Sequence, residues 1–147
     1  PEWCDRYIAL GVEYDVPVLI TRTLGVYGPN NHLADVDEIT FRRFVGQATD
    51  AGMPLFDRVL ETDFERQRDE PPRYTEMLTD LDGLVFCAYH PNARGPGEIE
   101  VIEPDTWHVR TDEHELFGTD EWRGWLDAQP FTLTTMRELR DEYRQRR

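Results

Sequence analysis

The sequence predicts an α/β fold in which parallel strands are flanked by outer helices. Short continuous apolar segments, such as residues 84–88, are typical of strands buried on both faces of a parallel sheet. Segments in which apolar residues recur at helical spacing alternate with them along the 147 residues. A chain of this length, with 39% hydrophobic residues, is expected to form a single α/β domain over 1–147.

The first helix and the first strand are predicted at the start of the sequence. A helix is expected over 3–14, where apolar side chains recur on one helical face. The residues of this face are Trp3, Tyr7, Leu10, Gly11 and Tyr14. The apolar segment 16–20 then predicts a buried strand, with Pro17 near its beginning, where a missing N–H donor costs least. Arg22 follows the carboxyl end of this strand.

The second helix is expected over 38–50. Asp35 and Glu38 have the spacing of a capping box in which aspartate replaces serine or threonine. Gly52 follows the predicted end of the helix, as glycine often does at the C′ position. The apolar face comprises Phe41, Phe44, Val45 and Ala48. Residues 54–57 predict a second short strand.

The third helix and the third strand are predicted on either side of a turn at Asp82-Gly83. Residues 61–72 are charged and end in proline, which indicates a surface loop or a linker helix. A helix is expected over 73–81, and the apolar segment 84–88 predicts the clearest buried strand in the sequence. This strand ends abruptly at Tyr89-His90-Pro91.

The last part of the chain is expected to be mainly helical. A Gly/Pro-rich loop over 92–97 leads to a helical stretch that is broken near Gly118, and Thr119 can cap the helix that follows. A last strand is predicted over 131–134. Residues 135–138 then have the sequence of a capping box for a terminal helix.

The composition excludes several classes of function. With 16 basic residues, all of them arginine, and 30 acidic ones, the formal net charge is −14. Such a chain lacks the basic surface that binds nucleic acids or anionic lipids, and it has no apolar run of about 18 residues that could span a membrane. Cys4 and Cys87 make no disulfide framework, which fits a reducing compartment, and we expect a cytoplasmic protein.

Functional residues in parallel α/β folds collect at the carboxyl ends of strands. This rule selects Arg22, Asp57, His90 and one of Thr134 and Thr135. His90 is the strongest of these candidates, because it directly follows a buried strand and precedes a Gly/Pro-rich loop. It is a candidate general acid–base or metal ligand. The alternative is a histidine that ends the edge of the strand and contacts water.

Two charged residues lie beyond this loop. Glu98 is eight residues after His90, and Arg110 could reach back toward the same region. An ordinary surface ion pair is the alternative for each of them.

The other histidines are weaker candidates. His108 and His114 are expected at the surface, and His32 could line a site but needs no role. The sequence has no His-Glu-x-x-His or Cys-x-x-Cys motif, which zinc sites often use. It also has no Gly-rich phosphate loop and no Gly-x-Ser-x-Gly motif.

Three segments of the chain, taken in order, resemble the YdjC/ChbG-type carbohydrate deacetylases. The segment PEWCDRYIALGVEYDVPVLITR (1–22) resembles the one that follows the metal-binding histidine motif of that family. The strand ending in Tyr89-His90-Pro91, then Glu98 and WHVRTD (107–112), is similar to the His-Pro, Glu and Arg region of the family. The tail FTLTTMRELR (131–140) resembles its closing strand and helix.

The resemblance implies a metal-dependent hydrolase that removes N-acetyl groups from amino sugars or oligosaccharides. The fold would be the C-terminal half of an incomplete (β/α), TIM-barrel-like barrel. His90 would be the proton donor at the mouth of the barrel, and Arg22, Glu98 and Arg110 would bind the sugar or hold His90. The divalent metal, Mg²⁺ or Zn²⁺, would be held by an aspartate and two histidines that precede Pro1. No residue of this chain is expected to be a metal ligand.

Two other readings stay open at the level of the sequence. The first is a non-catalytic α/β module, a degenerate half-barrel that binds a sugar or a protein partner. The second is a glycoside hydrolase, for which Asp57 and Glu61 are the carboxylates that the sequence offers. Half a barrel would leave sheet edges and an inner face uncovered, so we also expect self-association, with a homodimer as one form.

Overall fold

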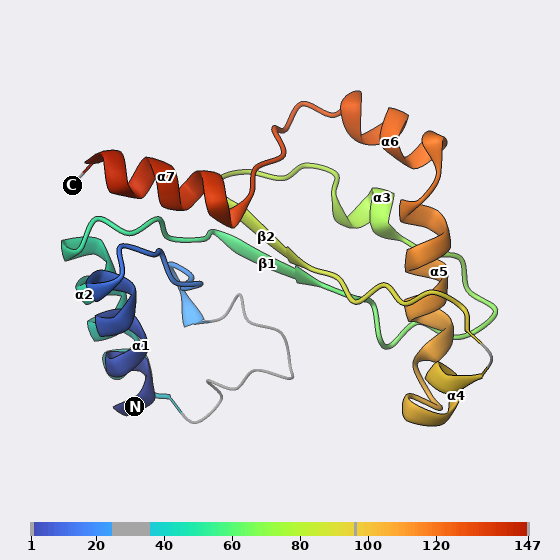
Figure 1. The fold of residues 1–147 in the computed structure, drawn as a ribbon, viewed down its shortest axis with the longest axis horizontal. Helices are drawn as coiled ribbons and strands as arrows, with labels where there is room; N and C mark the ends of the chain where they lie inside the picture. The colour runs from blue at the N-terminus through green and yellow to red at the C-terminus, as the bar shows by residue number, and fades with distance from the viewer. Residues whose placement is uncertain (1, 25–35, 96, 147) are drawn as a thin grey trace. The chain divides into compact units, whose positions relative to one another are not determined.

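A computed structural model describes residues 2–24, 36–95 and 97–146 (Figure 1). Within these residues the chain contains both helices and strands, which confirms a mixed α/β structure. The helices are α1 (Glu2–Glu13), α2 (Glu38–Asp50), α3 (Tyr74–Met77), α4 (Glu98–Ile102), α5 (Trp107–Phe117), α6 (Asp120–Asp127) and α7 (Met136–Arg146), and the strands are β1 (Arg58–Glu61) and β2 (Val85–Ala88). No helix among the described residues has the length and apolar character needed to cross a membrane.

The strands form a small parallel sheet. β1 pairs with β2 (Figure 1), and an isolated parallel bridge joins Thr21 to Phe56 just before β1. Around this bridge, the Phe56 N–H donates to the Ile20 carbonyl and the Arg22 N–H donates to the Phe56 carbonyl, each at 2.9 Å. The parallel pairing of β1 with β2 agrees with the predicted α/β class. The segment 16–20, predicted as a strand, forms none, because the chain pairs there only through the single bridge at Thr21, and half of a barrel remains a prediction.

The described residues divide into two compact units. Unit 1 contains the chain up to Val59, residues 82–86 and the chain from Leu133 onward, and unit 2 contains Leu60–Leu81 and Cys87–Thr132. Each unit is described by itself below.

The core of unit 1 forms between α1, α2 and the extended segment that follows each of them. The buried face of α2 contains Phe41, Phe44 and Ala48, as its helical spacing predicts. The other core residues of this unit are Ile8, Val18, Ile20, Val36, Met53, Leu55 and Tyr143. Cys4 packs against this core as a free thiol.

The apolar face predicted for α1 meets the core at only one of its members. Trp3, Tyr7, Leu10 and Tyr14 are exposed, whereas Gly11, the fifth member, is buried together with Ile8. Gly11 explains the difference. A Cβ atom at this position would lie 2.8 Å from the Val16 carbonyl oxygen and from side-chain atoms of Met53 and Val18. The helix therefore meets the core along the side that carries its smallest residue.

Local capping signals were reliable guides to the helix ends. Asp37 caps α2, with its Oδ1 accepting from the Thr40 N–H at 2.9 Å; the predicted cap Asp35 lies outside the described residues. Gly52 follows the helix with φ of +74°. Thr119 accepts from the Trp122 N–H at the start of α6, and the predicted capping box of α7 is present.

In that capping box the two partners bond reciprocally. The Glu138 carboxylate accepts from the Thr135 N–H at 2.8 Å, and the Glu138 N–H donates to the Thr135 hydroxyl at 3.2 Å. The strand predicted over 131–134 is absent, because no strand of the described residues pairs with this segment. Thr134 donates to Glu138 as well, so Thr134 and Thr135 belong to a helix start rather than to a strand end.

Other element boundaries also differ from the predictions. The strand expected over 54–57 begins four residues later, at Arg58, because the segment before it pairs only through the bridge at Phe56. The helix expected over 73–81 is confined to Tyr74–Met77. The segment 61–72 contains turns and no helix.

We predict opposite effects for two glycine-to-alanine substitutions in helices of unit 1. Gly11→Ala would force a methyl group into a filled contact, and we expect the free energy of unfolding to fall by about 1–3 kcal/mol. Gly46→Ala in α2 places its methyl group where no atom lies within 4 Å, and we expect a gain of about 0.5–1 kcal/mol from helix propensity. Urea unfolding followed by circular dichroism measures both. A loss at both positions would contradict the account of the contact at Gly11.

Candidate functional site

The candidate site lies at the carboxyl ends of β1 and β2. Thr62 directly follows β1, and its N–H donates to the carbonyl of Ala88, the last residue of β2. His90 follows two residues later. Because the strands are parallel, the residues that follow them emerge at the same edge of the sheet. The sequence-based rule therefore placed His90 correctly, at the end of a parallel strand.

The side chain of Thr62 fixes the imidazole of His90. The Thr62 hydroxyl oxygen lies 2.9 Å from His90 Nδ1 and accepts from the His90 backbone N–H at 3.0 Å. The hydroxyl oxygen has a second lone pair, so it can also accept from a protonated Nδ1. The ring is thus held with Nδ1 toward Thr62, and Nε2 is free of this contact. His90 is exposed, so Nε2 is accessible to a bound ligand.

A buried carboxylate holds the backbone of His90. Glu113 in α5 is fully buried, and its Oε2 accepts from the His90 N–H at 2.8 Å. Its Oε1 accepts from the Tyr74 hydroxyl in α3 at 2.6 Å. These two donors stabilise a carboxylate whose transfer from water is costly. Glu113 thus connects α3 and α5 to the end of β2.

An aromatic cluster surrounds the Tyr74–Glu113 pair. The ring of Tyr74 lies 5.2 Å from the rings of both Tyr89 and Phe117, in edge-to-face contacts. Burial, and then the hydrogen bond and charge of Glu113, hold the pKa of the Tyr74 hydroxyl well above its usual range. Burial also raises the pKa of Tyr89. Tyr74 therefore remains a hydrogen-bond donor throughout the physiological pH range.

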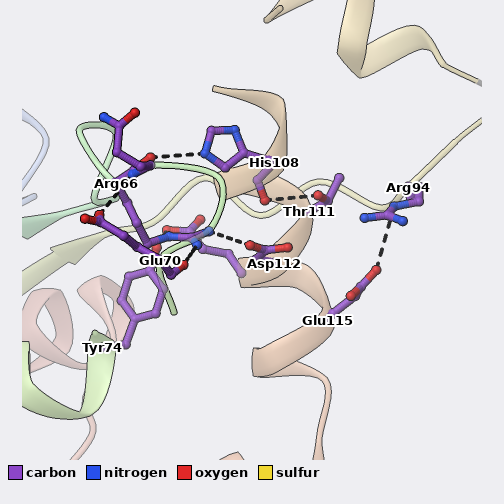
Figure 2. A network of polar contacts seen from close by, with 10 residues as sticks. Arg66, Glu70, Tyr74, Arg94, His108, Thr111, Asp112 and Glu115 are labelled. Atoms are coloured by element: carbon purple, nitrogen blue, oxygen red, sulfur yellow. Dashed lines mark hydrogen bonds and ion pairs between the residues drawn. The ribbon is translucent and has the colours of Figure 1, made fainter. Parts of the chain in front are cut away.

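A second polar network ties the segment 61–72 to α5 (Figure 2). The guanidinium of Arg66 is buried and pairs with Asp112, and it also donates to the Glu70 carbonyl. The Arg66 carbonyl lies 3.1 Å from His108 Nε2. Most of the segment is exposed, as expected for a surface loop, whereas the expectation of a surface position for His108 was wrong, because His108 is buried. The guanidinium of Arg66 can be buried because the Asp112 carboxylate and the Glu70 carbonyl accept its hydrogen bonds.

Arg110 is the second candidate residue that the structure brings to this region. Its guanidinium lies 5.0 Å from the centre of the Phe64 ring, and the Phe64 ring lies 5.3 Å from that of His90. Arg110 also forms an ion pair with Glu103 at 3.3 Å. Arg110 therefore contacts Phe64, which in turn contacts His90. The ion pair with Glu103 compensates part of the charge of Arg110.

The other two candidate residues are not joined to His90 by any described contact. Arg22 belongs to unit 1, where its Nε donates to Asp57 at 2.7 Å. Asp57 also accepts from the Leu84 N–H, and this bond, followed by Arg22, lowers the pKa of the carboxyl. Asp57 thus has a structural role in joining two segments. Glu98 is the exposed first residue of α4.

Reasoning from the sequence missed Thr62, Glu113 and Tyr74. The rule that functional residues follow the carboxyl ends of strands selects Thr62 once β1 is placed at Arg58–Glu61. Because the strand was predicted over 54–57, the rule selected Asp57 instead. Glu113 and Tyr74 are separated by 39 residues, and no local sequence pattern indicates that they pair. His114 is exposed, as expected, and His32 lies outside the described residues.

The described residues contain no group of three or more His, Cys, Asp or Glu side chains that could hold a metal ion. A scan against protein-family models finds no match, and searches of curated proteins and of solved structures find no similar protein. The functional argument thus rests on the geometry around His90 and on the three resembling segments.

We predict that stability falls as the pH rises above about 10, and that Tyr74 contributes to this loss. The folded state keeps the Tyr74 proton that the unfolded state releases near its ordinary pKa of about 10. The unfolded state then binds fewer protons, so the free energy of unfolding decreases with pH. Because the chain has no lysine, tyrosines and cysteines dominate this range.

Urea unfolding at several pH values from about 9 to 11 tests this prediction. Tyr74→Phe should make the decline with pH shallower by about one proton. Equal slopes for the wild type and Tyr74→Phe would contradict the assigned pairing.

Proposed function

We propose that this protein is a carbohydrate deacetylase that hydrolyses the N-acetyl group of amino sugars, with His90 as the proton donor. The observation that carries the proposal is the fixed imidazole at the carboxyl end of β2, whose Nδ1 faces Thr62 at 2.9 Å. The resemblance of three ordered segments to carbohydrate deacetylases supports the substrate class.

The proposed role of His90 follows from the chemistry of amide cleavage. A water oxygen forms a bond to the acetyl carbon, and the bond from this carbon to the sugar nitrogen then breaks. The nitrogen leaves as an amine only if it gains a proton at that step. His90 donates this proton from Nε2 as an imidazolium and is left as a neutral ring with its hydrogen on Nδ1, toward the Thr62 hydroxyl, while the attacking water loses a proton to solvent. General acid catalysis of this kind contributes about 10²–10⁴-fold to the rate.

The charged candidates have roles in binding the sugar in this proposal. Arg110 contacts the ring of Phe64, and Phe64 contacts the ring of His90. The planar guanidinium of Arg110 can donate hydrogen bonds to sugar hydroxyls. We assign Glu98 and Arg22 to sugar binding on the resemblance alone. A divalent metal, which the resemblance implies, would polarise the acetyl carbonyl and activate the attacking water when bound.

The alternative is a non-catalytic module that binds a sugar or a partner. The two functions differ in turnover, since a module binds the amino sugar and releases it unchanged. The glycoside hydrolase reading receives less support. Asp57, one of the carboxylates it requires, accepts hydrogen bonds from Arg22 and Leu84 that hold the fold.

We predict that His90→Ala lowers kcat/KM by about 10²–10⁴-fold in the native protein. The backbone N–H that binds Thr62 and Glu113 is retained in this variant, so the fold should persist. Release of primary amine from N-acetylated amino sugars and chito-oligosaccharides measures the activity. His114→Ala is the matched control, because His114 is an exposed histidine of α5, and it should keep wild-type turnover.

Two outcomes would overturn the proposal. Turnover of His90→Ala equal to that of the wild type would remove His90 from the reaction. Binding of the amino sugar by the wild type with no release of amine or acetate would favour the binding module.

A further inference from the structure

Helix α1 carries an apolar stripe that the rest of unit 1 does not cover. The exposed fractions are 81% for Trp3, 52% for Tyr7, 47% for Leu10 and 63% for Tyr14. Single exposed apolar residues are normal, but four large ones on the same helical face form a continuous patch that is typical of an interaction surface. Tyrosine and tryptophan are also enriched in protein interfaces.

The orientation of α1 is fixed, so the helix cannot turn this stripe inward. Ile8 is buried against the core, and Gly11 makes close contacts with the Val16 carbonyl. At the end of the helix, Arg144 of α7 donates to the carbonyls of Tyr14 and Asp15 at 3.2 and 3.0 Å. The stripe is therefore available to another molecule.

The spacing of the stripe indicates that its partner is a helix. Residues 3, 7, 10 and 14 are separated by four, three and four positions, which is the a/d spacing of a heptad repeat. Such a seam faces a second helix in knobs-into-holes packing. The helix of 12 residues has a length of about 18 Å, which suits one short helix of similar length.

The charges beside the stripe indicate which helix this is. Arg6 and Glu13 are one heptad apart, each directly before a tyrosine of the stripe, so both lie on the same flank. Both are exposed, and neither forms an ion pair with another described residue. A partner helix with the opposite order of charges would pair with both. An antiparallel copy of α1 has that order.

We propose that α1 is a homodimer interface, in which it pairs antiparallel with α1 of a second copy about a two-fold axis. Trp3 then meets Tyr14 of the partner subunit, and Tyr7 meets Leu10 of the partner subunit, so that all four stripe residues are covered. Arg6 lies beside Glu13 of the partner subunit, and symmetry repeats this pair. The proposal is independent of the deacetylase function, because it uses only residues of α1.

A parallel pair of α1 helices would not match the charges. In parallel coiled coils a residue at the position of Arg6 meets the position that Gly11 occupies in the other helix. Both Arg6 and Glu13 would then lack an opposite charge. The antiparallel arrangement alone uses both charges.

Charge reversal tests this arrangement in the native protein. Arg6→Glu and Glu13→Arg should each weaken the dimer, because each places like charges together twice in the interface. The double variant R6E/E13R should restore the wild-type dissociation constant. Tyr7→Glu should raise the dissociation constant at least about tenfold by placing a charge in the seam. Analytical ultracentrifugation over a range of concentrations measures these constants.

The matched control is Ile39→Glu, which introduces the same charge at an isoleucine of α2 that is 82% exposed, and it should leave the dimer unchanged. Circular dichroism confirms that each variant remains folded. A monomer at all accessible concentrations would overturn the proposal and leave the stripe to a different protein. A dimer that tolerates the single charge reversals, or a double variant that does not recover, would place the interface elsewhere.

Discussion

The carboxylate of Glu113 is the constraint on which the structure of unit 2 depends. It is fully buried, and transfer of a carboxylate from water costs on the order of several kcal/mol unless donors replace the lost hydration. The Tyr74 hydroxyl and the His90 N–H are those donors. Both donors must therefore stay in place, and with them the end of β2 and the start of α3. The hydrogen bond between the His90 N–H and the buried Glu113 carboxylate fixes the backbone that carries the exposed imidazole.

Thr62 contacts the imidazole ring of His90, whereas Glu113 contacts only its backbone N–H. The Thr62 hydroxyl contacts both the backbone N–H and Nδ1 of His90, so one side chain sets the position of the ring and leaves Nε2 free of this contact. Proton transfer from Nε2 requires both, since it depends on the position of the ring and on access to the nitrogen. The structure of the site thus agrees with a role for His90 in catalysis, and the deacetylase proposal follows from this agreement together with the resembling segments.

Much of the fold could be predicted from the sequence because its signals are local. The bounds of α2 and the capping boxes depend on residues within four positions of each other, and the apolar segment of β2 is continuous. The predictions were wrong where contacts in the interior, rather than local sequence patterns, determine which residues are buried. Gly11, not the aromatic stripe, faces the core of unit 1, and Arg66 is buried because Asp112 accepts it. The candidate site could be predicted at His90, whereas Glu113 reaches it from a distant helix.

The central claim is that Thr62 holds the imidazole of His90 with Nδ1 toward its hydroxyl, which leaves Nε2 free to transfer a proton. NMR of the imidazole nitrogens tests it directly, with Thr62→Val as the variant that keeps the shape of the side chain and removes its hydroxyl. We expect the neutral ring of the wild type to carry its hydrogen on Nδ1, where the Thr62 hydroxyl accepts it, and the variant to show more of the tautomer with hydrogen on Nε2. A wild-type ring with hydrogen on Nε2, or the same distribution in both proteins, would contradict the claim.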